Sequence, residues 1–97
     1  QELERILYNK RIKNPYYHAL LADEALFKDK DKAAIKHYKQ AIRLDKNIHE
    51  FYFGLAKVYY KQNRIGAARQ AMMKAISVSR SPSIDSQYVA KLNLLKK

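Results

Sequence analysis

The chain lacks several residue types, and each absence removes a class of protein. Its 97 residues include no cysteine, which excludes disulfides, thiolate nucleophiles and thiolate metal sites. Only two glycines and two prolines occur, and so few helix breakers favour a mostly helical chain. No apolar run approaches the roughly 18 residues that a membrane span requires. With 30% charged and 47% hydrophobic residues, the composition is that of a single folded domain.

Acidic residues are also scarce, above all in the second half. Residues 1–50 carry eleven Lys and Arg against eight Asp and Glu, whereas residues 51–97 carry nine against one, Asp85. The net charge is +11. Long-range attraction therefore favours acidic partners or anionic surfaces, although the charge says nothing about the fold.

No catalytic or metal-binding motif is present. The three histidines, His18, His37 and His49, lack the spacing of a metal site, and HExxH and GxSxG patterns are absent. Asp23 and Glu24 are adjacent on an expected helix, so their carboxylates point in different directions and cannot act as a pair. We therefore predict no enzyme activity, no cofactor and no metal, with surface or half-buried histidines.

The sequence contains an internal repeat with a period of 34 residues. Sliding residues 15–48 onto residues 49–82 needs no gap and gives six identities at small or aliphatic positions. The identical pairs are Leu21 and Leu55, Ala22 and Ala56, Ala33 and Ala67, Ala34 and Ala68, Ala41 and Ala75, and Ile42 and Ile76. A fixed period of this length is typical of a helical repeat array.

The second copy resembles the tetratricopeptide repeat pattern. It reads Tyr52-x2-Leu55-Ala56-x2-Tyr59, then Ala68-x3-Met72-x2-Ala75. In the first copy His18 and Ala25 replace the two large aromatic residues. The resemblance implies an all-α fold, a tetratricopeptide-type α-solenoid of antiparallel helix hairpins. Alanines would allow two helices to approach closely, and large residues would be buried: Tyr38, Leu55, Tyr59 and Met72.

The resemblance also gives an expected layout for residues 1–97 as one domain. Residues 1–13 would be the second helix of a truncated upstream repeat, 15–48 repeat one, 49–82 repeat two and 83–97 a capping helix. Because the chain begins with Gln1 and not Met, we expect it to be part of a longer protein. Residues 14–22 and 49–56 are similar to the C-terminal repeats of bacterial transglutaminase-like proteins that carry tetratricopeptide tails.

Local signals predict where helices begin. Asn14 followed by Pro15 is typical of an N-cap and a first helical residue. Asn47 with Glu50 resembles a capping box, and Asn63 is the expected N-cap of the fourth helix of the two repeats.

Family resemblance implies a concave groove lined by the first helix of each repeat and by the capping helix. Its predicted partner-binding residues are Tyr16, Asp23, Phe27, Glu50, Phe53, Lys57, Tyr60, Lys61, Gln87 and Lys91. Exposed aromatic residues beside lysines favour a peptide with apolar and acidic residues. The carboxylate clamp of chaperone-binding relatives is missing, because Ala19 and Asp23, then Phe53 and Lys57, hold its positions.

Two other kinds of partner stay open at this point. Basic residues follow the outer side of the second helix of each repeat, which would suit nucleic acid, although no nucleic-acid motif is present. They are Lys32, Lys36, Lys39 and Arg43, then Arg64, Arg69 and Lys74. A second copy of the chain could also pair through an exposed N-terminal helix bearing Leu3, Ile6 and Leu7.

Overall fold

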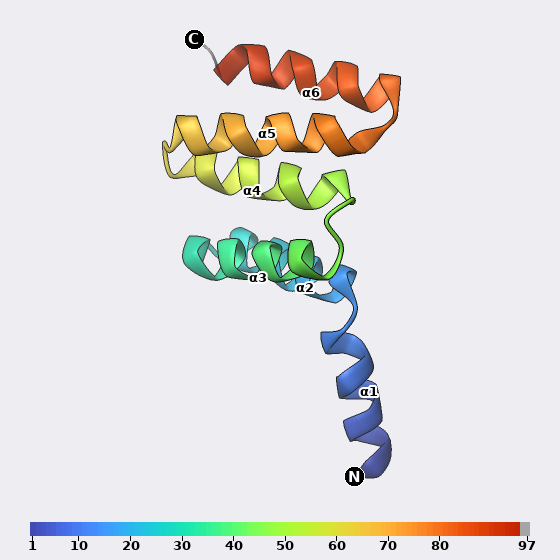
Figure 1. Ribbon diagram of the computed structural model, residues 1–97. Helices are drawn as coiled ribbons and strands as arrows, with labels where there is room; N and C mark the ends of the chain where they lie inside the picture. The colour runs from blue at the N-terminus through green and yellow to red at the C-terminus, as the bar shows by residue number, and fades with distance from the viewer. Residues whose placement is uncertain (96–97) are drawn as a thin grey trace. The chain divides into compact units, whose positions relative to one another are not determined.

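A computed structural model describes residues 1–95, which form six helices and no strand (Figure 1). The helices are α1 (Glu2–Ile12), α2 (Pro15–Phe27), α3 (Asp31–Leu44), α4 (His49–Lys61), α5 (Ile65–Ser79) and α6 (Pro82–Leu95). The all-α prediction is confirmed. The last two positions of the predicted capping helix lie outside the described residues. None of the six helices is both long and apolar enough to cross a membrane.

The helices fall into two compact units. The first unit, Gln1–Lys46, contains α1, α2 and α3, and the second begins at Asn47 and contains α4, α5 and α6. Within the first unit α2 packs against α3, and α1 contacts α2. Within the second unit α5 lies between α4 and α6 and packs against both (Figure 1).

Each hairpin is held by small residues where its two helices meet. In the first unit Ala22 and Ala34 are fully buried. In the second unit Ala56 and Ala68 expose at most 1% of their surface. A methyl side chain allows two backbones to approach closely, so these alanines set the spacing of each hairpin. The 34-residue repeat predicts this role, close approach of two helices, for the four alanines.

Large side chains complete the core as predicted. Tyr38, Leu55, Tyr59 and Met72 expose between 2% and 8% of their surface. By contrast, α1 has no buried residue, and Leu3, Ile6 and Leu7 on it are 67%, 44% and 43% exposed. Pairing of two copies through this helix stays a prediction.

The backbone repeats the 34-residue period at the turn inside each hairpin. Asp29 and Asn63 both adopt left-handed conformations, with φ angles of 61° and 60°. The amide of Lys30 donates to the Ala25 carbonyl, and the amide of Arg64 donates to the Tyr59 carbonyl, each at 2.8 Å. These are Schellman bonds, which close the end of a helix. Asn63 therefore ends α4, and its predicted role as the N-cap of α5 is wrong.

Of the other two predicted helix starts, one is correct and one is wrong. Asn14 is the N-cap of α2, because its side chain accepts a hydrogen bond from the Tyr16 amide at 2.9 Å and Pro15 follows. The predicted N-cap at Asn47 is wrong, because the N-cap of α4 is Ile48, whose side chain makes no cap hydrogen bond. Ile48 has the extended backbone conformation that is typical of an N-cap residue.

Replacing Arg80 with glycine should stabilise the chain. Arg80 ends α5 in a left-handed conformation, with φ of 58°. This conformation costs a residue with a Cβ atom roughly 1–2 kcal/mol, and glycine avoids it. We expect Arg80→Gly to raise the free energy of unfolding by about 1 kcal/mol in urea denaturation. Asn63→Gly is the control and should gain less, because asparagine tolerates this conformation. An Arg80→Gly variant no more stable than the parent would contradict the assignment.

Candidate functional site

The second unit contains a cavity that gathers four of the predicted groove residues. Its volume is about 360 Å³. Phe53, Lys57 and Tyr60 reach it from α4, and Lys91 reaches it from α6. The remaining lining is apolar and comes from all three helices of the unit: Ala56, Met72, Leu94 and Leu95.

The aromatic ring of Phe53 lines this cavity beside two positive charges. Two ammonium groups lie near it, Lys57 Nζ at 5.2 Å and Lys91 Nζ at 5.8 Å from the ring centroid. Both distances are within the range of a cation–π interaction. The residues that line the cavity include no acid. The arrangement therefore offers an apolar hollow next to two positive charges.

Tyr88 of α6 supports the Phe53 ring by stacking on it. The two rings stack with centroids 5.2 Å apart and an interplanar angle of 29°. The Tyr88 hydroxyl lies 2.6 Å from His49 Nδ1, and His49 Nε2 lies 3.3 Å from Glu50 Oε1. Burial, and then the charge of Glu50, raises the pKa of Tyr88, so the hydroxyl keeps its proton and can donate to His49. Glu50 and His49 thereby orient the aromatic ring on which Phe53 stacks.

The remaining predicted residues of the second unit lie outside this cavity. Lys61 lines a neighbouring cavity of about 590 Å³, which it shares with Tyr60, Leu94 and Leu95. Gln87 is exposed on α6. The sequence does not single out Leu94 or Leu95 for the groove, and it places Met72 in the core alone. The register of α6 against α5 decides which leucines reach the cavity, and no repeat pattern fixes that register.

In the first unit the predicted residues have different surroundings. Phe27 is 89% exposed and Tyr16 is 58% exposed. The carboxylate of Asp23 accepts a hydrogen bond from the buried Tyr38 hydroxyl. Burial raises the pKa of Tyr38 well above its usual value, and the bond to Asp23 adds to this effect. Asp23 therefore already has a structural role within its own hairpin.

Two basic or titratable residues differ from their expected exposure. His18 is buried, with 9% of its surface exposed, although the sequence predicts a surface or half-buried ring. Its Nε2 lies 2.8 Å from the carbonyl oxygen of Ile12, so the ring is held at the end of α1. Arg69, expected on the outer basic face, is half-buried and donates to the Leu95 carbonyl at 3.3 Å.

Comparison with known proteins bears directly on the repeats. A TPR repeat profile matches residues 28–63, and a tetratricopeptide repeat profile matches residues 49–82. The search of curated proteins returned no match. Descent from a bacterial transglutaminase-like parent stays a prediction, because both matches concern the repeats alone. Together they span residues 28–82, more than half of a chain whose helices, alanine contacts and turns repeat every 34 residues, and the chain therefore belongs to the tetratricopeptide repeat family.

Proposed function

We propose that this chain is a non-catalytic module that binds a peptide or protein segment, with the Phe53 cavity as the main contact. Tetratricopeptide repeats are generally protein–protein interaction modules and typically have no catalytic activity. The observation that carries the finer proposal is the placement of Lys57 and Lys91, from two helices, around one aromatic ring in an apolar cavity.

The ligand that suits this cavity is an extended peptide with an apolar side chain next to an acidic one. The apolar side chain would enter between Phe53, Met72 and Leu95, which line the cavity. The acidic side chain would pair with Lys57 and Lys91. No residue that lines the cavity is acidic, so none competes for these two charges. Tyr60 is 60% exposed at the rim. Buried aromatic contacts supply most of the affinity in such interfaces, and charges mainly raise the association rate.

Nucleic acid is the rival ligand, and the structure gives it less support. Lys36 and Arg43 on α3 are exposed, as the basic-face interpretation requires. On α5, however, Arg69 is bound to α6 through the Leu95 carbonyl. The Arg64 guanidinium lies 4.7 Å from the ring centroid of Tyr59. The second basic face is thus partly used inside the unit.

One pair of variants separates the two ligands. Peptides that bind the chain are selected from a library, and their affinities are measured for Phe53→Ala/Lys57→Ala and for Lys36→Ala/Arg43→Ala. The first variant removes a cavity anchor and one charge, so we expect affinity to fall by about tenfold or more. The second removes two exposed charges that do not line the Phe53 cavity and should change affinity by less than about twofold.

The salt dependence provides a second measurement. Peptide binding through two lysines should weaken only modestly as salt rises. Binding of an oligonucleotide would instead give a steep linear fall of log affinity against log salt. Loss of binding in the Lys36→Ala/Arg43→Ala variant, with the cavity variant unaffected, would overturn the proposal and favour a polyanion.

A further inference from the structure

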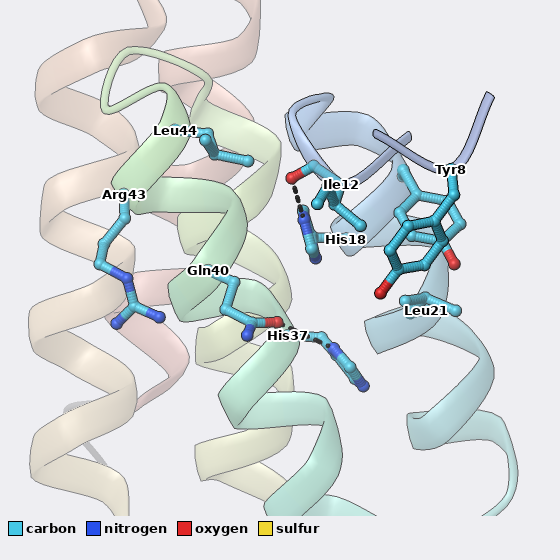
Figure 2. Close-up of a pocket in the computed structure, with 9 residues that line it drawn as sticks. Tyr8, Ile12, His18, Leu21, His37, Gln40, Arg43 and Leu44 are labelled. Atoms are coloured by element: carbon cyan, nitrogen blue, oxygen red, sulfur yellow. Dashed lines mark hydrogen bonds between the residues drawn. The ribbon is translucent and has the colours of Figure 1, made fainter. Parts of the chain in front are cut away.

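The first unit contains its own hollow, separate in sequence from the Phe53 cavity. Its volume is about 480 Å³, and residues of α1, α2 and α3 line it. Figure 2 shows Ile12 and His18 on one side, Tyr8 on the other and Leu21 below them. The walls from α1 and α2 are mainly aromatic and aliphatic, and α3 adds the polar side chains of His37, Gln40 and Arg43. His18 is the buried polar residue of the lining.

One nitrogen of this imidazole has no hydrogen-bond partner. Nε2 lies 2.8 Å from the Ile12 carbonyl oxygen. A carbonyl can only accept, so Nε2 carries a proton and donates. Nδ1 is then the acceptor of the neutral ring, and it is buried without a partner. Buried polar atoms are nearly always paired in folded proteins, and an unpaired one is costly. The hollow therefore lacks a hydrogen-bond donor at His18.

The 34-residue register shows what side chain the hollow lacks. His18, Tyr17 and Leu21 correspond to Tyr52, Phe51 and Leu55. The three residues of the second copy are buried, with 7%, 2% and 7% of their surface exposed. In the first copy Tyr17 and Leu21 are only half-buried and line the hollow. Where the second copy has a phenol ring, the first has a smaller imidazole and open space.

The remaining polar groups of the lining do not call for a charged ligand. His37 Nδ1 and Gln40 Oε1 lie 3.2 Å apart, within hydrogen-bond distance of each other. Arg43 lines the hollow, but Figure 2 shows its guanidinium on the side of α3 away from His18. A neutral ring between Tyr8 and His18 would therefore bury apolar surface and leave no charge without solvent.

We propose that this hollow binds a neutral aromatic ring that carries one hydrogen-bond donor, such as a phenol, with the donor bonded to His18 Nδ1. The ring would occupy part of the hollow of about 480 Å³, and its hydroxyl would supply the absent donor. Because Nδ1 is buried, binding requires the imidazole to turn so that this atom faces the ligand. The same chemistry can come from a free phenol or from a tyrosine side chain of a partner.

The test uses p-cresol as the probe and the full chain labelled with 15N. On titration with p-cresol, the ring nitrogens of His18 should shift and saturate, because Nδ1 gains a donor. Toluene has the same shape without the hydroxyl and should bind about tenfold more weakly. Absence of a His18 shift, or equal binding of toluene, would overturn the proposal. A tripeptide with a central tyrosine and blocked ends then distinguishes the sources: its binding assigns the hollow to a partner's tyrosine, and its failure beside binding of p-cresol assigns it to free phenols.

Two variants check the place of binding. His18→Tyr removes the Nδ1 acceptor and places the larger ring of the second copy at the wall of the hollow, so it should abolish p-cresol binding. His18→Gln keeps one donor for Ile12 and one acceptor for the ligand, and should retain binding to within about threefold. Circular dichroism confirms that each variant is folded. Undiminished p-cresol binding by folded His18→Tyr would show that the phenol binds elsewhere and would overturn the proposal.

Discussion

Replacing Leu55 with alanine should lower the free energy of unfolding by about 2–5 kcal/mol, the range for large-to-small changes in a core. Leu55 lies on α4 and exposes 7% of its surface. Removing its isobutyl group forfeits the burial of that group and leaves a cavity, because close-packed neighbours relax only in part. Domains of this size are typically stable by about 5–15 kcal/mol. The variant should therefore lose a large share of its total stability.

The measurement is urea denaturation followed by circular dichroism, with Leu20→Ala as the matched control. Leu20 has the same side chain on α2 but is 63% exposed. Its replacement should change the free energy of unfolding by less than about 0.5 kcal/mol. An unchanged denaturation midpoint for Leu55→Ala would show that the repeat register places the wrong residues in the core.

The fold was predictable because small and large apolar residues recur at corresponding positions of the two repeats. Alanine at positions such as 22 and 56 marks a helix crossing, and its identity follows from sterics alone. The same reasoning identified Tyr38 and Met72 as buried. Helix starts were less predictable. Asn14 and Asn63 have the same side chain, yet one caps a helix and the other bends the chain in a left-handed turn. Both roles suit asparagine, so sequence preference alone does not separate them.

The family resemblance implied four of the residues that line the candidate site. They are Phe53, Lys57 and Tyr60 on α4 and Lys91 on α6, and the structure places them at one cavity. Leu94 depends on how α6 lies on α5, which no 34-residue pattern specifies. The burial of His18 was missed for another reason. Its partner is the carbonyl of Ile12, and the sequence gives no sign of a backbone oxygen left unpaired at the end of α1.

Deleting residues 82–97, and with them α6, should have the largest effect on stability. Tyr88 is 6% exposed and stacks on Phe53, while its hydroxyl binds His49. Loss of a buried aromatic side chain alone costs about 3–5 kcal/mol. For a domain of this size that cost lowers the melting temperature by at least about 10 °C. The deletion also uncovers Phe53 and Met72, so the truncated chain should self-associate, since repeat proteins need a polar terminal face.

Deletion of residues 1–13 is the matched control, because it also removes one terminal helix. No residue of α1 is buried, so this second truncation should lower the melting temperature far less and leave the chain monomeric at the same concentration. Differential scanning calorimetry and sedimentation velocity on both truncated chains make the comparison. If the chain without α6 stays soluble and melts with the parent, α6 is a dispensable tail. The cavity around Phe53 would then be an open face of the hairpin that α6 does not help to build.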